Sequence, residues 1–269
     1  MKWGSRMPSF DLTDRVAIVT GGAQGFGKAI ALALAHHGAN VAVVAREPEA
    51  VTVGRERPHA SVLPVVDEIR EIGSRAIGIT ADVREQENVD ALVAQTMAEF
   101  GKIDILVNVA GGSWGETFRS GPLVELEPHD FIECYRLNVL TAFMCSRAVQ
   151  PIMKGQGKGA IVNIASGAGV NPGTGQAAYG AAKAGVINMT KSMAFEWAPE
   201  IRVNSIALGG IETPHRPMWA EQVQQSAVSR NALGRLGTPD EHAGTVLWLV
   251  SDAANFITGE TVAADGGRR

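Results

Sequence analysis

The chain of 269 residues carries a net charge of −4 at pH 7, with 45% hydrophobic and 19% charged residues. This length and composition indicate one globular domain, residues 1–269, and exclude a disordered chain. The acidic balance argues against a nucleic-acid partner, and no apolar run is long enough for a membrane helix. Cys134 and Cys145 are expected on one helix about 16 Å apart. They therefore cannot pair, and we expect a reduced, cytoplasmic protein.

Short apolar runs alternate with amphipathic segments along the chain, a pattern typical of parallel strands joined by helices. Strands are expected at 15–20, 40–45, 75–80, 103–109, 159–165, 202–207 and 260–264. Helices are expected at 26–37, 62–72, 85–100, 128–153, 176–198 and 239–251, the last opened by the capping sequence TPDE at 238–241. Residues 1–12 form an N-terminal extension, and two longer stretches fit no element, 46–60 and 209–232. We predict a single-domain α/β fold, a doubly wound parallel sheet of about seven strands with helices on both faces.

The segment TGGAQGFGK at 20–28 follows the first strand and opens the first helix. Gly21, Gly25 and Gly27 permit a tight turn and a close backbone approach, and the free N–H groups of a helix start attract a pyrophosphate. The spacing is G-x-x-x-G-x-G rather than the commoner G-x-G-x-x-G. Because a strand precedes the glycines and a helix follows them, the segment predicts a dinucleotide site.

The sequence AAYGAAKAG at 177–185 places Tyr179 and Lys183 one helical turn apart among small residues that let a large ligand approach. A lysine ammonium about 4 Å from a phenol favours the phenolate by about 4 kcal/mol at an effective dielectric of ~20. This is about the free energy that brings a tyrosine pKa from ~10 to near 7. Taken alone, the pair also fits a packed helix whose polar tips reach the surface.

From about residue 13 to residue 267 the sequence resembles the short-chain dehydrogenase/reductase family. The resemblance is carried by TGGAQGFG at 20–27, ADV at 81–83, NVAG at 108–111, NIASGAG at 163–169, YGAAK at 179–183, RVNSIALGGIETP at 202–214, and the stretch that begins LGRLGTPDE at 233. It implies a Rossmann-type oxidoreductase that interconverts a small-molecule ketone and the corresponding secondary alcohol. The relatives include 3-oxoacyl-carrier-protein reductases and sugar or polyol dehydrogenases, and the sequence does not decide between them.

The resemblance also implies the site residues. Tyr179 would exchange a proton with the substrate oxygen, Ser166 would hydrogen-bond that oxygen, and Lys183 would hold the nicotinamide ribose. Asn138 would lie where the helix backbone distorts, holding a water in a relay to Lys183. The cofactor contacts would include Gly21, Gln24, Gly25, Phe26, Gly27, Arg46, Asp82, Val83, Asn108, Ala110, Gly111, Tyr179, Lys183, Ile211 and Thr213.

The end of the second strand bears on the choice of cofactor. An acidic residue there holds the ribose hydroxyls of NAD, whereas an arginine suits the 2′-phosphate of NADP. Here Ala45 is followed by Arg46 and Glu47. The planar, permanently charged Arg46 favours NADP(H) over NAD(H), and the alternative is a solvated Arg46 with Glu47 on the ribose. A second positive charge has three candidates, Lys28, Arg55 and Arg57.

Other expectations concern substrate and assembly. The segments that shape the substrate pocket in the family contain Trp114, His215, Met218 and Trp219, which suggests a partly apolar substrate. The stretch 48–60 is longer than is typical and either covers the adenosine phosphate or forms a surface loop. The helices at 128–153 and 176–198 imply, by resemblance, an intersubunit bundle and a homotetramer or homodimer. No residues have metal-ligand spacing.

Two other functions remain open from the sequence. One is an NAD-preferring sugar, polyol or hydroxysteroid-type dehydrogenase. The other is a cofactor-sensing protein with the same fold and no chemistry, although such proteins usually lose the tyrosine or the lysine, and both are present here.

Overall fold

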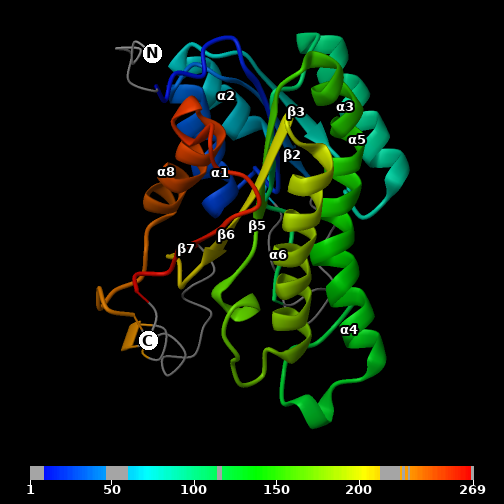
Figure 1. The fold of residues 1–269 in the computed structure, drawn as a ribbon, viewed down its shortest axis with the longest axis vertical. Helices are drawn as coiled ribbons and strands as arrows, with labels where there is room; N and C mark the ends of the chain where they lie inside the picture. Colours follow the sequence, from blue (N-terminus) through cyan, green and yellow to red (C-terminus); the bar gives the residue numbers. More distant parts are fainter. Residues whose placement is uncertain are drawn as a thin grey trace.

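The computed structural model describes residues 9–46, 60–113, 117–212, 225, 228–229 and 231–267. Strands and helices alternate from β1 to β7 (Figure 1). The strands are β1 (Val16–Thr20), β2 (Asn40–Ala45), β3 (Ala76–Thr80), β4 (Ile105–Asn108), β5 (Gly159–Ile164), β6 (Ile201–Leu208) and β7 (Thr261–Ala264). The helices are α1 (Gly25–His36), α2 (Leu63–Ile72), α3 (Gln86–Phe100), α4 (Pro128–Tyr135), α5 (Thr141–Gln156), α6 (Ala177–Trp197) and α8 (Pro239–Val250). Short helical turns lie at η1 (Leu123–Glu125), η2 (Arg136–Leu140), η3 (Gly167–Gly169) and η5 (Asp252–Ala254).

The seven strands form one parallel sheet in the order β3-β2-β1-β4-β5-β6-β7. The chain winds outward from β1 through β2 to β3, and then returns to pair β4 with the other side of β1. The strand order therefore reverses between β1 and β4, and ligands of such sheets bind outside the carboxyl ends of the strands at this point. The predicted doubly wound α/β fold is confirmed.

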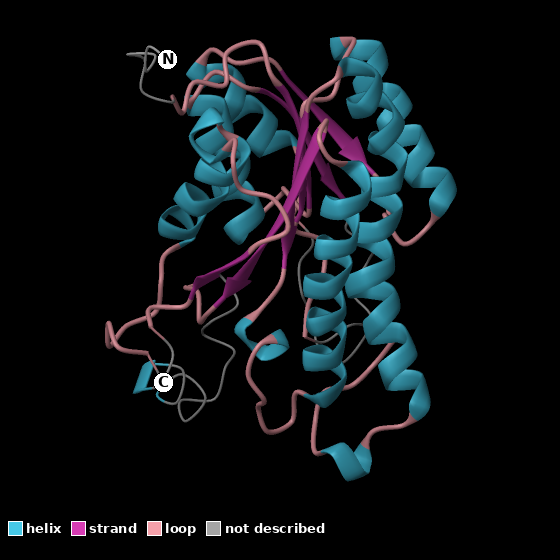
Figure 2. Ribbon diagram, in the orientation of Figure 1, coloured by secondary structure: helices cyan, strands magenta, loops and turns pink. Residues whose placement is uncertain are grey.

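Helices cover both faces of the sheet, with α1, α2 and α8 on one side and α3, α5 and α6 on the other (Figure 2). Two separate buried clusters fill the space between helices and sheet. One contains Ile30, Leu34 and Val246, and the other contains Leu92, Val149 and Met193. Because the central strands are buried on both faces, their sequences are apolar at successive positions rather than at alternate ones.

The predicted helix at 128–153 is three consecutive pieces: α4, the π-helical turn η2, and α5. A π turn inserts one extra residue into a helix and is often found at functional sites. Cys134 and Cys145 lie on either side of this turn, and both are free, buried thiols. Within the described ranges, no helix combines the length and hydropathy needed to cross a bilayer.

Candidate active site

The loop between β1 and α1 has the geometry of an anion cradle. Gly21 and Gly25 adopt positive φ angles of 68° and 52°, which side chains disfavour. A Cβ on Gly27 would lie 2.0 Å from the Gly21 carbonyl oxygen, so only glycine permits this approach. Gln24 is the N-cap of α1 but makes no side-chain capping bond, and the first turn of α1 holds no acidic residue. The helix N-terminus is thus suited to a phosphate group.

The segment after β4 lies directly beside this loop. The Thr20 hydroxyl accepts hydrogen bonds from the backbone N–H groups of Val109 (3.1 Å) and Ala110 (3.2 Å). A Cβ on Gly21 would lie 3.1 Å from the Ala110 nitrogen. The predicted cofactor residues Gly21 and Ala110 are therefore neighbours at the point where the strand order reverses.

Asn108 lies deeper in the protein than Ala110 and Gly111, which follow it in the NVAG motif at 108–111. It is buried at the end of β4, and its Nδ2 donates to Asn163 Oδ1 (2.8 Å) and to Ser146 Oγ (2.9 Å). Asn163 in turn donates to the Thr190 hydroxyl at 2.9 Å. This network joins β4 and β5 to α5 and α6 beneath the site, so the Asn108 amide nitrogen serves the protein interior.

The adenosine side of the expected cofactor site contains Arg46, Asp82 and Arg84. Arg84 binds both carboxylate oxygens of Asp82, with Nε at 3.0 Å from each. Burial raises the pKa of Asp82, but hydrogen bonds from Arg84 and the charges of Arg84 and Arg46 outweigh it and hold the pKa below its ordinary value. Lys28, a candidate for a second phosphate-binding charge, is instead paired with Glu68 at 2.6 Å. The other two candidates, Arg55 and Arg57, lie outside the described residues.

Ser166, Tyr179 and Lys183 come together where β5 ends against α6. The Ser166 side chain caps η3, accepting the Ala168 N–H at 3.2 Å, and hydrogen-bonds the Tyr179 hydroxyl. Lys183 is 3% exposed, donates to the Ile164 carbonyl at 2.7 Å, and lies with Nζ 5.8 Å from the centre of the Tyr179 ring. A hydroxyl, a phenol and an ammonium group are thus assembled at one point.

Small residues allow this assembly. A Cβ on Gly169 would lie 2.6 Å from the Lys183 carbonyl carbon, and a Cβ on Gly180 would lie 2.8 Å from the Ala168 carbonyl oxygen. The loop that carries Ser166 can therefore pack directly on α6 beside Tyr179. The small residues around the Tyr–Lys pair serve this close packing, in addition to any room they leave for a ligand.

The pKa values of Tyr179 and Lys183 differ from those expected of a phenol whose ionised form is stabilised by a nearby ammonium. Burial lowers the pKa of Lys183 to about 8, with Cys134 acting weakly in the opposite direction. Burial raises the pKa of Tyr179 to about 12, even though the Ser166 hydrogen bond lowers it. Lys183 donates to a carbonyl and flanks the ring, so its charge does not offset the desolvation of the phenol. In the free protein, burial therefore outweighs the Ser166 hydrogen bond, and the pKa of Tyr179 lies above its ordinary value.

Asn138 lies in the π turn, as expected from its predicted place of backbone distortion. Its side chain pairs with both backbone groups of Gly112: Nδ2 donates to the carbonyl at 2.9 Å, and Oδ1 accepts the N–H at 3.0 Å. Nδ2 also donates to the Cys134 carbonyl at 3.0 Å. A Cβ on Gly111 would lie 2.7 Å from Asn138 Oδ1 and 3.4 Å from Lys183 Nζ, so these three residues meet.

Ile211 lies in the segment after β6, next to Gly237 in an isolated parallel bridge. Thr213 and the candidate substrate residues Trp114, His215, Met218 and Trp219 lie outside the described residues, as does 48–59 of the long stretch. Sequence reasoning missed the buried His242, whose ring contacts Phe26. A histidine at an apolar position of α8 was the only available signal.

Across the residues that the structure describes, no group of three His, Cys, Asp or Glu side chains is arranged to hold a metal ion. The groups that the structure brings together at the site are glycine-rich loops, the hydroxyl groups of Ser166 and Tyr179, and the buried ammonium of Lys183.

Comparison with known proteins identifies the family. Residues 21–269 match the family described as Enoyl-(Acyl carrier protein) reductase. The chain is 40% identical over 261 residues to (2S)-[(R)-hydroxy(phenyl)methyl]succinyl-CoA dehydrogenase subunit BbsD of Thauera aromatica, covering 96% of this chain and 97% of that one. The chain belongs to the short-chain dehydrogenase/reductase family.

Further members of the short-chain dehydrogenase/reductase family match this chain over nearly its full length. The 3-oxoacyl-[acyl-carrier-protein] reductase FabG of Thermotoga maritima is 35% identical, with 95% of this chain and 98% of FabG covered. A 7α-hydroxysteroid dehydrogenase solved with NADH and 7-oxo glycochenodeoxycholic acid superposes with a TM-score of 0.86 at 32% identity, with 96% of each chain covered. The predicted family is confirmed, and with it an oxidoreductase that interconverts an alcohol and a ketone with a pyridine nucleotide.

Proposed function

We propose that this enzyme uses Tyr179 as the general acid and base of a carbonyl–alcohol interconversion that prefers NADP(H). One observation carries the proposal: Ser166, Tyr179 and Lys183 converge beside Gly111, next to the strand-order reversal. The glycine cradle and the uncapped start of α1 fit the pyrophosphate of a dinucleotide. A bound nicotinamide supplies or accepts the hydride.

The chain's own groups handle the proton. In reduction, Ser166 hydrogen-bonds the carbonyl oxygen, and Tyr179 donates its phenolic proton to the developing alkoxide. The raised pKa of Tyr179, about 12, keeps this donor protonated throughout the neutral range. In oxidation the phenolate is the base, and forming it requires positive charge beyond that of Lys183, as an oxidised nicotinamide would provide. Lys183, anchored on the Ile164 carbonyl, holds the ribose side of the cofactor.

Two supporting roles complete the site. Asn138 fixes the loop after β4 through its paired bonds to Gly112, and its π turn carries the proposed water relay to Lys183. Asp82 and Val83 flank the adenine, and Ile211 with Thr213 binds the carboxamide and pyrophosphate. The stretch 209–232 shapes the substrate pocket within the single domain 1–269.

The cofactor preference rests on Arg46, which follows Ala45 at the end of β2, on the adenosine side of the fold. Its charge helps to hold the pKa of Asp82, which follows β3, below the ordinary value. The second candidate is an NAD-preferring enzyme, and one observation favours it: Lys28 is paired with Glu68 and adds no free charge.

The substrate is a partly apolar small-molecule ketone or secondary alcohol, and the names of the relatives contain acyl, hydroxyacyl-CoA and steroid groups. We also infer a homotetramer or homodimer, because α4 and α6 expose large apolar side chains, Ile132, Tyr135 and Phe195. Two buried free thiols fit a reducing, cytoplasmic compartment.

The substitution Tyr179→Phe tests the proposal. It removes the hydroxyl and keeps the ring, so turnover of a ketone panel should fall by roughly 10²–10⁴-fold. NADPH should still bind, as measured by the fluorescence of the bound nucleotide. Retained turnover would refute the role of Tyr179. A wild-type protein that binds NADPH but turns over no carbonyl would instead indicate a cofactor sensor.

A further inference from the structure

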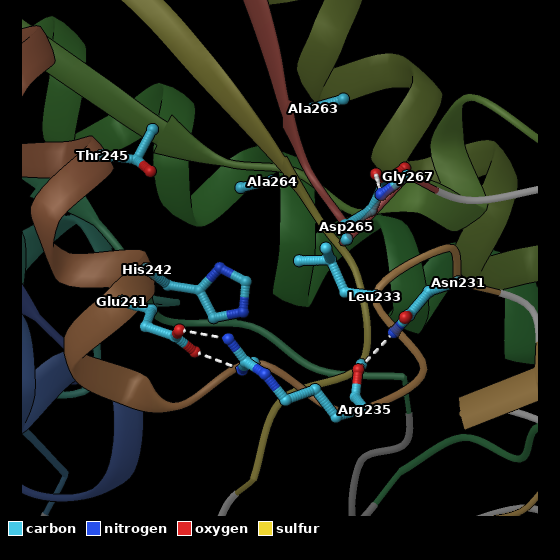
Figure 3. Close-up of a pocket in the computed structure, with 13 residues that line it drawn as sticks. Asn231, Leu233, Arg235, Glu241, His242, Thr245, Ala263, Ala264, Asp265 and Gly267 are labelled. Atoms are coloured by element: carbon cyan, nitrogen blue, oxygen red, sulfur yellow. Dashed lines mark hydrogen bonds and ion pairs between the residues drawn. The ribbon is translucent and has the colours of Figure 1, made fainter.

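A cavity of about 230 Å³ lies between α8, the loop 231–237 and the segment that follows β7. Figure 3 shows the His242 ring reaching from α8 into this cavity, beside the ion pair of Arg235 and Glu241. The residue is only 6% exposed, and the proposed mechanism does not use it. Its contacts on two sides indicate what it does.

On one side, His242 packs against the phosphate loop. Its ring and that of Phe26 have centres 6.0 Å apart and planes at 80°, the edge-to-face arrangement that aromatic pairs prefer. Phe26 is the second residue of α1 and lies between Gly25 and Gly27 of the glycine cradle. Movement of the His242 ring would therefore move the start of the helix that faces the pyrophosphate.

On the other side, His242 packs against Gly237. A Cβ on Gly237 would lie 2.5 Å from Nε2, so the ring fills the space of a side chain there. Gly237 donates its N–H to the Gly210 carbonyl at 3.0 Å, and its own carbonyl accepts the Glu212 N–H at 2.9 Å. These bonds hold Ile211 between them, in the segment that faces the nicotinamide in the proposed function.

The ring makes these contacts as a neutral group of fixed shape. Nε2 is buried and has no hydrogen-bond partner. Burial lowers the pKa of His242, although the Glu241 carboxylate beside it raises it, so the environment of the ring favours the neutral imidazole. Because Nε2 makes no hydrogen bond, the ring contributes through its packing.

We propose that His242 is a positioning residue that couples the phosphate loop to the Ile211 segment, so that one ring sets the spacing of both cofactor-binding segments. The proposal rests on the proposed function, in which these two segments hold the dinucleotide. It predicts that changes to the ring alter nucleotide affinity more than they alter the fold.

The test measures the dissociation constants of NADPH and NADH by fluorescence, together with the thermal stability of the free protein. His242→Ala should weaken binding of the preferred nucleotide about tenfold, whereas His242→Phe, which keeps the ring, should bind nearly as the wild type does. Val149→Ala is the matched control, since Val149 is fully buried on α5 and belongs to the separate core cluster, which contains neither Phe26 nor Ile211. It should lower stability and leave the affinity unchanged.

A double substitution sharpens the test. Gly237→Ala should weaken nucleotide binding in the wild type, because its Cβ displaces the ring, but much less in the His242→Ala background. Wild-type affinity in His242→Ala, an equal loss in Val149→Ala, or additive effects of the His242 and Gly237 substitutions would each overturn the coupling. If the wild type binds neither nucleotide, the proposed function fails and the coupling fails with it; if only the variants contradict expectation, the proposed function stands.

Discussion

The two sides of the strand-order reversal form their parts of the site by different means. The side of β1 and α1 uses backbone: glycines with positive φ, a close approach at Gly27, and free N–H groups of a helix start. The side of β5 and α6 uses side chains, with Ser166, Tyr179 and Lys183 packed tightly enough for burial to shift the pKa values of the phenol and the ammonium. Added volume should therefore damage the first side, and changed proton chemistry should damage the second.

The largest effect is expected from Gly27→Ala on the backbone side. The new Cβ would lie 2.0 Å from the Gly21 oxygen, so the loop must move, at a cost of about 3 kcal/mol or more, and NADPH binding should be lost. Gly244→Ala is the matched control, because a Cβ there meets nothing within 4 Å and the residue is helical. It should be neutral or stabilising by up to about 1 kcal/mol. Equal behaviour of the two variants in denaturation and NADPH titrations would contradict the close approach.

The activity and stability of the β5 and α6 side of the site should depend on pH through the titration of Lys183. Its pKa is lowered from 10.5 to about 8, so the ammonium loses its proton as the pH rises through about 8, and carbonyl reduction should decline there. Between about pH 8 and pH 10.5 the unfolded chain holds this proton and the folded chain does not, so this group makes the free energy of unfolding rise with pH.

Lys183→Met should remove this pH-dependent gain in stability and lower kcat by roughly 10²–10⁴-fold. Lys191→Met, an exposed lysine on the same helix, should change neither. Urea denaturation of the three proteins at several pH values provides the comparison. A wild type whose stability follows that of Lys183→Met across this range would show that the ammonium is not desolvated.

A smaller effect is expected from Arg46→Ala. Arg46 follows β2, next to the part of the site that β1 and α1 form. Loss of a charge-assisted phosphate contact of about 1.5–3 kcal/mol should reduce the preference for NADPH over NADH roughly 10–100-fold. Lys28→Ala should change it less, because Glu68 already engages that ammonium. Initial rates with both nucleotides measure the ratio, and an unchanged ratio in Arg46→Ala would favour the NAD-preferring alternative.

Local patterns in the sequence predicted most of the fold. Apolar runs located the strands, TPDE located the start of α8 with its Thr238–Glu241 capping box, and the glycine spacing located the tight turn between β1 and α1. The extra residue of the π turn did not show in the pattern, since its apolar positions still fit a continuous helix.

What the sequence could not provide was the outcome of long-range packing. The interior network of Asn108, the bond from Lys183 to the Ile164 carbonyl and the contact of His242 with Phe26 all join segments distant in the chain. Spacing alone placed Lys183 near Tyr179, but the sign of the Tyr179 pKa shift depends on burial, which follows from tertiary structure.

Titration of the Tyr179 phenol shows whether burial in the free protein holds it protonated and whether bound NADP⁺ reverses this. The chain has two tyrosines, and the other, Tyr135, is 47% exposed, so Tyr135→Phe leaves a single reporter. The absorbance of the phenolate is then followed against pH, with and without NADP⁺. The account predicts no ionisation of Tyr179 near its ordinary pKa of 10 in the free protein and a lower pKa when NADP⁺ is bound. A phenol that ionises at or below pH 10 in the free protein, or that ignores NADP⁺, would contradict it.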